Sequence, residues 1–137
     1  MKTALNFLFL FLSFFLLVAC SSPDEEMKAA GIQSINAVDA SKKFTSEEAI
    51  IIDVREKYEW DEQHIPGAIF IPVAQLGTRL AEINQYKDRP VIMQCHSGRR
   101  SAQAAVLLHG AGFKEVYNLS GGILAWKQAG LDLEKKK

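Results

Sequence analysis

Short apolar runs alternate with segments of helical spacing along most of the chain. The apolar runs predict strands at 32–37, 49–54, 69–71, 91–93 and 116–119. Between them, periodic apolar positions and strong helix formers predict helices at about 39–44, 56–63, 76–83, 101–109 and 121–128. Strands that alternate with helices indicate parallel βαβ units, and right-handed crossovers place helices on both faces of the sheet. The pattern therefore predicts an α/β fold.

Cys95 occupies the most informative position in this pattern. It follows the buried run 91–93 and precedes the helical segment 101–109, in a loop that holds one glycine and two arginines. Ligands bind at this edge of an open parallel sheet, where loop N–H groups and a helix N-terminus attract anions. These features favour the thiolate, which is the nucleophilic form of cysteine. A buried structural cysteine is the alternative, but it would not require such a loop.

Four segments, in the same order, resemble the motifs of the rhodanese-type sulfurtransferases: Asp53-Val54-Arg55-Glu56, His64-Ile65-Pro66-Gly67-Ala68, Cys95-His96-Ser97-Gly98-Arg99-Arg100-Ser101 and Gly121-Gly122-Ile123-Leu124-Ala125-Trp126. The resemblance covers residues 32–133. It implies a rhodanese-like fold, with a five-stranded, mostly parallel sheet and helices on both faces.

The resemblance also implies a reaction. Cys95 takes a sulfane sulfur from a donor such as thiosulfate, forms a persulfide, and passes the sulfur to a thiol or to cyanide. The substrate would be bound by the loop residues that follow, namely His96, Ser97, Gly98, Arg99, Arg100 and Ser101. In this interpretation Arg100 shapes the loop and supplies positive potential, while Arg99 faces the incoming donor. Neither a metal nor an organic cofactor is expected.

Other residues near these motifs are expected to support the site. Asp53 and Arg55 should emerge beside the Cys95 loop, and the simplest role for them is a local ion pair. Trp126 could line the mouth of the pocket or fill the core. His64 is expected to fix a turn through hydrogen bonds. His96 departs from the arginine that is common at this position in the family, and a neutral imidazole weakens the positive rim.

Two other functions remain open at this point. Phosphatases and arsenate reductases of related fold place five residues between cysteine and arginine, whereas four separate Cys95 from Arg100 here. The shorter loop favours sulfur over a tetrahedral oxyanion. A non-catalytic or redox-sensing module, in which Cys95 is only an oxidisable thiol, is the second alternative.

The N-terminal stretch predicts a targeting signal. Residues 1–19 carry Lys2 and then an apolar run that suits a signal peptide better than a membrane span. Leu-Val-Ala before Cys20 resembles a bacterial lipoprotein cleavage box, so lipid on Cys20 and cleavage before it are expected. An ordinary secretory signal is the alternative. Residues 20–31 are then a lipidated N-terminus and tether, and 32–137 are the rhodanese-like domain.

The charge and the cysteine content of the chain limit the classes of partner that it is expected to bind. The chain has 16 basic and 16 acidic residues, which argues against a nucleic-acid partner. A lipidated Cys20 would leave Cys95 without a second thiol in its own chain. The expected partners are therefore a small sulfur donor, an acceptor that can also be a protein, and a membrane reached through the anchor. The expected location is the bacterial cell envelope, facing the periplasm, with the outer membrane favoured by Ser21.

Overall fold

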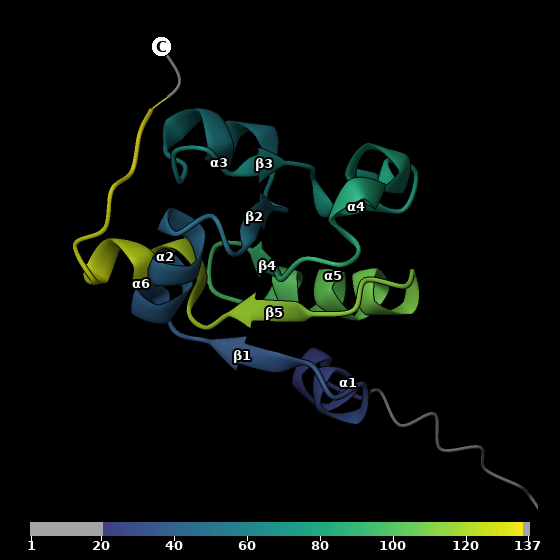
Figure 1. Ribbon diagram of the computed structural model, residues 1–137. Coiled ribbons are helices and arrows are strands. Elements are labelled where there is room, and N and C mark those ends of the chain that lie inside the picture. Colours follow the sequence, from purple (N-terminus) through teal and green to yellow (C-terminus); the bar gives the residue numbers. More distant parts are fainter. Residues whose placement is uncertain (1–20, 136–137) are drawn as a thin grey trace, which may run out of the picture.

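We describe residues 21–135 of a computed structural model of the chain (Figure 1). The predicted signal peptide and the predicted lipidation site Cys20 lie outside these residues. Five strands form one sheet in the order β1-β5-β4-β2-β3, and every adjacent pair is parallel. The strands are β1 (Gln33–Ile35), β2 (Ile50–Asp53), β3 (Ile69–Phe70), β4 (Val91–Gln94) and β5 (Val116–Leu119). The predicted α/β fold is confirmed, with all strands parallel.

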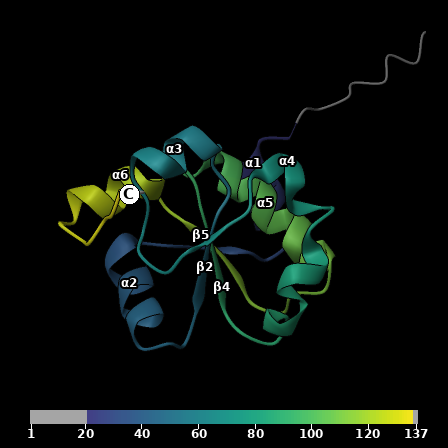
Figure 2. The same ribbon diagram turned by 90° about the horizontal axis from the view of Figure 1, so that it is seen from above.

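Helices cover both faces of this sheet. They are α1 (Pro23–Ala29), α2 (Ala37–Thr45), α3 (Lys57–Glu62), α4 (Val73–Leu76), the 3-10 helix η1 (Leu80–Tyr86), α5 (Arg99–Gly110) and α6 (Gly122–Gln128). Figure 2 shows α2 and α6 on one side of the strands, and α1, α4 and α5 on the other. Within residues 21–135, no helix is long and apolar enough to cross a bilayer.

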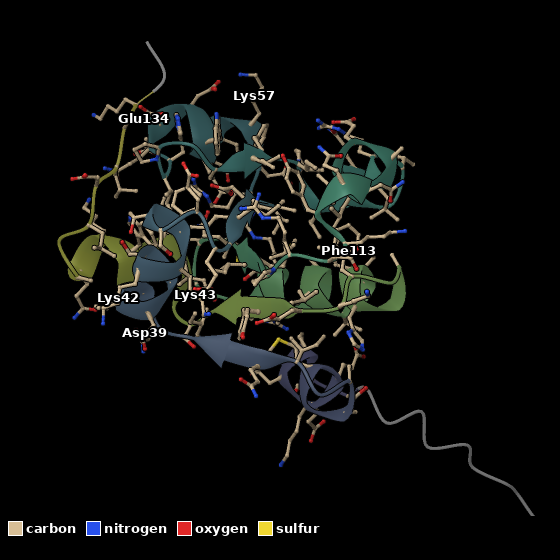
Figure 3. The ribbon with its side chains drawn as sticks, viewed as in Figure 1. Asp39, Lys42, Lys43, Lys57, Phe113 and Glu134 are labelled. Carbon is tan, nitrogen blue, oxygen red and sulfur yellow. The ribbon has the colours of Figure 1, made fainter. Side chains whose placement is uncertain are left out.

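The central strand β4 is buried on both faces, which explains its continuous apolar sequence. Val91 and Met93 pack into the core beneath α5, while Ile92 packs into the core beneath α2 and α6. All three side chains are fully buried. The two apolar layers hold β4 in place, and Cys95 directly follows the carboxyl end of this strand. Charged side chains occur instead on the exposed side of α2, where Asp39 pairs with Lys42 (Figure 3).

The stretch predicted to be a tether is instead largely helical. Ser22 caps α1 because its hydroxyl accepts a hydrogen bond from the Glu25 N–H. The Glu25 carboxylate accepts a hydrogen bond from the Ser22 N–H in turn. Pro23 then suits the first helical turn. Met27 is buried against the core near α5. The capping box stabilises α1, and the burial of Met27 with Ala30 beside it holds the helix against the domain, so the domain begins earlier than predicted.

Several predicted boundaries also shift for local reasons. α2 begins after Asn36, whose side chain accepts a hydrogen bond from the Asp39 N–H at 2.9 Å, and not after Asp39 or Ser41 as predicted. The helical spacing across 76–83 belongs to two short pieces, α4 and η1, rather than to one helix. α5 begins two residues before the predicted start because Gly98 caps it.

Candidate active site

The candidate site lies at the carboxyl edge of the sheet, where β4 and β2 end side by side. Asp53 pairs in register with Gln94, the residue before Cys95. The expected proximity of Asp53 and Arg55 to the Cys95 loop is therefore confirmed. α5 starts four residues after Cys95 and runs for 12 residues, so its N-terminal dipole lies at the loop.

Gly98 makes the sharp turn from the loop into α5. Its φ of 103° is a left-handed conformation that L side chains rarely adopt. A Cβ here would also lie 3.3 Å from the Leu119 carbonyl oxygen and 3.4 Å from the Gly121 nitrogen. Glycine at this position therefore lets the loop close against the end of β5 and the start of α6.

The Cys95 side chain points into the loop and is almost fully buried, with 1% of the residue exposed. Its Sγ accepts a hydrogen bond from the Gly98 N–H and lies within hydrogen-bond distance of the Ser101 hydroxyl oxygen, both at 3.2 Å. Hydrogen bonds to the charged form of a group favour that form. This arrangement, with the α5 dipole, gives the sulfur an environment suited to an anion.

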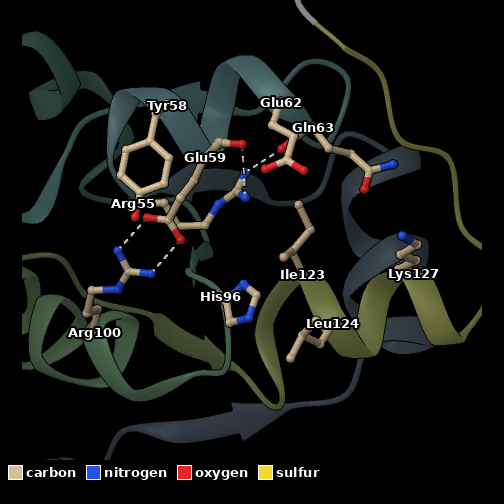
Figure 4. Close-up of a pocket in the computed structure, with 10 residues that line it drawn as sticks. All are labelled: Arg55, Tyr58, Glu59, Glu62, Gln63, His96, Arg100, Ile123, Leu124 and Lys127. Atoms are coloured by element: carbon tan, nitrogen blue, oxygen red, sulfur yellow. Dashed lines mark hydrogen bonds and ion pairs between the residues drawn. The ribbon is translucent and has the colours of Figure 1, made fainter.

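Arg100 forms a bidentate ion pair with Glu59 of α3. Its Nη1 and Nη2 lie 2.7 and 2.8 Å from the two carboxylate oxygens (Figure 4). The Arg100 hydrogen bonds lower the pKa of Glu59 to about 2, and the same bonds raise the pKa of Arg100, with a smaller contribution from Cys95. The guanidinium thus fixes the loop to α3, while Glu59 offsets much of the positive potential expected from it.

The contribution of the Glu59–Arg100 pair to the free energy of unfolding should decrease at acid pH. The pKa of Glu59 is lowered from 4.5 to about 2, so its contribution is present above pH 4.5 and is lost as the pH falls toward 2. We expect Glu59→Gln to reduce the free energy of unfolding at neutral pH by about 1.5–3 kcal/mol. Urea unfolding between pH 2 and 7 measures this difference, which should vanish at the acid end. Glu62→Gln, on the same helix but exposed, is the control.

Asp53 and Arg55 form the ion pair that the sequence predicts, and both are buried. Arg55 Nη2 lies 2.7 Å from Asp53 Oδ2, and Arg55 Nε bonds both carboxylate oxygens. The same guanidinium donates to the Glu59 and Gln63 carbonyls of α3 and its C-terminal end. It lines a hollow beside the loop (Figure 4). The pair therefore joins β2 to α3, which in turn holds Arg100.

Breaking this buried pair should destabilise the domain strongly. Asp53→Asn leaves the Arg55 guanidinium buried without a charged partner, and such changes cost about 3–5 kcal/mol. The measurement is the midpoint and slope of urea unfolding at neutral pH. Asp39→Asn is the matched control, since Asp39 pairs with Lys42 at 3.4 Å on the surface. A loss no larger than that of the control would contradict a structural role for the buried pair.

Two hollows adjoin the loop from different directions. The first, of about 460 Å³, is lined by His96, Arg100, residues of α3 and residues of α6 (Figure 4). The second, of about 400 Å³, is lined by Ser97, Gly98, Arg99 and Asn118, and by residues near the start of α1. Arg99 and Arg100 therefore face different hollows, and the exposed His96 borders the first.

Trp126 lies in the core and not at the pocket mouth. It is 3% exposed, packs in the apolar layer beneath α2 and α6, and donates its indole N–H to the Asp132 carbonyl at 2.9 Å. Of the two roles considered for it, filling the core is the one found.

The N-terminus of α6 packs directly against the loop. The Ile123 N–H donates to the Cys95 carbonyl at 2.8 Å, and the Leu124 N–H donates to the His96 carbonyl at 3.3 Å. This approach leaves no room for a side chain at Gly122, where a Cβ would lie 2.3 Å from the Cys95 oxygen. Glycine at position 122 thus lets α6 come close enough to the loop to form these two hydrogen bonds.

His64 has a structural role through hydrogen bonds, but these bonds reach α3 and the C-terminal segment and not the turn that was expected. Its Nδ1 lies 2.8 Å from the Trp60 carbonyl oxygen and its Nε2 lies 3.0 Å from Glu134 Oε1. The ring stacks on Trp60 at 3.9 Å between centroids. Glu134 belongs to the C-terminal segment that passes beside α3 (Figure 3). His64 therefore binds the end of the chain to the helix that carries Glu59.

A parallel sheet that presents a cysteine at its carboxyl edge, in a loop that opens a helix, defines a class of α/β proteins. The chain belongs to the rhodanese-like domain family, which it matches over residues 36–129. Rhodanese-like sulfurtransferases are its relatives in sequence and in structure.

Individual relatives agree with this membership. The chain is 35% identical over 103 residues to a protein of Allochromatium vinosum named as a sulfurtransferase, which covers 74% of this chain and 94% of that protein. It is 38% identical over 99 residues to YrkF of Bacillus subtilis (strain 168), covering 72% of this chain and 52% of that protein. The chain thus spans about half the length of YrkF.

Solved structures give the same result. A rhodanese-like domain protein from Staphylococcus aureus superposes with a TM-score of 0.67 and 30% identity, covering 77% of this chain and 100% of that one. A thiosulfate sulfurtransferase from Pseudomonas aeruginosa superposes with a TM-score of 0.71 and 28% identity, covering 84% of this chain but 22% of that one.

Three residues at the site were not identified from the sequence. Glu59 is far from Arg100 along the chain, so no local pattern links them. Gly122 was seen only as part of a family motif. Asn118 is a buried polar residue in the apolar strand β5, and it contacts both Ser101 and Gly98. A polar residue inside a predicted buried strand was the one available signal, because buried polar groups need partners.

Proposed function

We propose that the protein transfers a sulfane sulfur through a persulfide on Cys95. The observation that carries the proposal is the sulfur itself, which lies at the start of α5, accepts a hydrogen bond from the Gly98 N–H and lies 3.2 Å from the Ser101 hydroxyl oxygen. The N–H and the helix dipole favour a thiolate, which is the attacking species in sulfur exchange.

The reaction has two balanced steps. The Cys95 thiolate attacks the outer sulfur of a donor such as thiosulfate, whose S–S bond breaks and releases sulfite. A thiol or cyanide then attacks the outer sulfur of the persulfide, and the bond to Cys95 breaks to restore the thiolate. The persulfide charge would be stabilised by loop N–H groups and the dipole of α5. Thiosulfate binding is the step to test first, because the first hollow offers a dianion less positive charge: Glu59 offsets Arg100 there, and His96 stands where an arginine is common in the family.

Intact mass spectrometry tests the proposal directly. Incubation with thiosulfate, followed by removal of the donor, should add the mass of one sulfur atom, and cyanide should remove it. An unmodified protein would overturn the proposal and favour a redox-sensing module. Hydrolysis of p-nitrophenyl phosphate in place of sulfur transfer would favour a phosphatase. The spacing of four residues between Cys95 and Arg100 argues against that outcome.

We further propose that the protein is anchored in the bacterial cell envelope by lipid on Cys20. The sequence Leu-Val-Ala-Cys at 17–20 carries this proposal. Only Ser21 separates Cys20 from Ser22, the cap of α1, so an anchor would attach close to the folded domain. We expect the anchor to hold the domain at the periplasmic side of the membrane, with the outer membrane favoured.

Membrane attachment should depend on the Cys20 sulfur. We expect Cys20→Ala to move the protein from the membrane fraction to the soluble fraction without loss of sulfur transfer, since Cys20 precedes the folded residues that build the site. Fractionation and mass spectrometry of the mature N-terminus make the measurement. Recovery of the unaltered protein in the soluble fraction, or a mature N-terminus elsewhere than Cys20, would contradict the proposal.

A further inference from the structure

A closed ring of hydrogen bonds joins the Cys95 sulfur to Asn118 of β5. The Ser101 hydroxyl lies 3.2 Å from Cys95 Sγ and 2.6 Å from Asn118 Oδ1. The Asn118 Nδ2 donates to the Gly98 carbonyl at 3.0 Å, and the Gly98 N–H donates to Cys95 Sγ at 3.2 Å. All four residues are buried.

The orientation of the Asn118 amide follows from its partners. The Gly98 carbonyl can only accept a hydrogen bond, so the NH₂ group must face it. The amide oxygen then faces the Ser101 hydroxyl. Because the amide oxygen also only accepts, the short contact of 2.6 Å requires the hydroxyl proton to lie between the two oxygens. The Ser101 oxygen can then accept a bond from the Cys95 thiol proton.

The arrangement changes when Cys95 loses its proton. The thiolate and the Asn118 oxygen are both acceptors, and the Ser101 hydroxyl has one proton to donate. If the proton goes to the thiolate, the buried amide oxygen is left without a donor, which is unfavourable. Asn118 therefore opposes the stabilisation that Ser101 offers to the thiolate.

A persulfide would reverse this competition. Its negative charge lies on the outer sulfur, and the inner Sγ becomes a neutral divalent sulfur, which is a weak acceptor. The Ser101 proton can then return to Asn118, and every buried group in the ring has a partner. The free thiolate is thus the one form in which Asn118 loses a hydrogen bond.

We propose that Asn118 is a positioning residue that draws the Ser101 hydroxyl away from the thiolate, and so favours the thiol and persulfide forms of Cys95. Its effect on the thiolate is independent of the reaction, whereas its effect on the persulfide rests on the proposed sulfur transfer. The same amide, through the Gly98 carbonyl, holds the turn that opens α5.

The test is the pH dependence of alkylation at Cys95, followed on its own peptide by mass spectrometry after treatment with iodoacetamide. Ser101→Ala removes a donor to the thiolate and should move the midpoint to higher pH. Asn118→Leu frees that donor and should move the midpoint to lower pH. Each change should alter the thiolate fraction below the midpoint by about tenfold, as expected for one hydrogen bond to a charged group. The double variant should match Ser101→Ala alone.

The opposite signs separate this role from simple support of the loop. If Asn118 only held the Gly98 turn, its loss would disturb the sulfur environment and move the midpoint upward, as Ser101→Ala does. An upward shift, no shift, or an equal shift in the Ser101→Ala background would each overturn the proposal. Thermal unfolding checks that each variant folds. If Asn118→Leu does not fold, Asn118→Ala, which adds no volume, is used in its place.

A second measurement tests the role of Asn118 and the proposed sulfur transfer separately, so that failure of one can be told from failure of the other. Protein loaded with thiosulfate is treated with dithiothreitol, and the loss of the added sulfur is timed by intact mass. Asn118→Leu should lose it several-fold faster, because the thiolate that is released no longer deprives a buried amide of its donor. If no persulfide forms in any variant but the alkylation shifts appear, sulfur transfer fails and the role of Asn118 at the thiolate stands.

Discussion

Cys95→Ser is expected to abolish sulfur transfer while leaving the domain folded. The thiol is the nucleophile in the proposed reaction, and a serine hydroxyl ionises too weakly near neutral pH to replace it. Serine is also close in size to cysteine, so the packing around the buried position should persist. We expect the rate of thiocyanate formation from thiosulfate and cyanide to fall by roughly 10³-fold or more, to the background.

Cys20→Ser provides the matched control, because it makes the same atomic change at the other cysteine of the chain. It should keep the rate of the unaltered protein. Thermal unfolding of both variants shows that activity is compared between folded proteins. Sulfur transfer by Cys95→Ser above the background would mean that another group carries the sulfur, and the proposed persulfide on Cys95 would be wrong.

The strands of the sheet were predictable because buried strands consist largely of apolar residues, and such runs are visible in the sequence. Runs such as 91–93 are apolar at every position, since β4 is covered on both faces. β5 was placed at its observed bounds, 116–119, although it contains the polar residue Asn118. Helix ends were less predictable, because they depend on which side chain caps the first turn, as Asn36 does for α2.

The site was predictable where its parts are adjacent along the chain or follow the carboxyl ends of neighbouring parallel strands, as Asp53 and Cys95 do. Cys95, Gly98 and the two arginines form one loop, and Asp53 pairs with Arg55 two residues away. The contacts that give these residues their roles come from distant segments. Glu59 binds Arg100 from another helix, and Asn118 reaches Ser101 from another strand. Such contacts depend on the folded arrangement, and no local pattern in a single sequence encodes them.

The predicted tether shows how a local signal can be misread. The segment 21–30 is polar and acidic, which is typical of a linker. The same residues contain a capping box at Ser22 and Glu25 and one buried side chain, Met27, with Ala30 packed beside it. Burial of Met27 holds α1 against the domain. Composition described the exposed face of a helix, and the single buried position decided the structure.

Gly122→Ala is expected to displace the Cys95 loop and to reduce sulfur transfer by about 10²-fold. A Cβ on Gly122 would lie 2.3 Å from the Cys95 carbonyl oxygen and 2.5 Å from that of His96. These are backbone atoms, so no flexible side chain can move aside, and either the loop or the start of α6 must shift. The bonds from Ile123 and Leu124 to the loop would then lengthen or break. A displacement of about 1 Å at a reacting group can cost 10²-fold in rate.

Gly130→Ala is the control for Gly122→Ala. It places an alanine in the same left-handed backbone conformation but without the steric clash. Gly130 has a φ of 71°, close to the 55° of Gly122, but a Cβ there meets nothing within 4 Å. Both variants should lose stability from backbone strain, on the order of 1–2 kcal/mol. Only Gly122→Ala should also lose thiosulfate:cyanide activity and persulfide loading, both measured well below the unfolding temperature. Equal activity in the two variants would show that the loop tolerates the displacement, and that the contact with α6 does not position Cys95 for sulfur transfer.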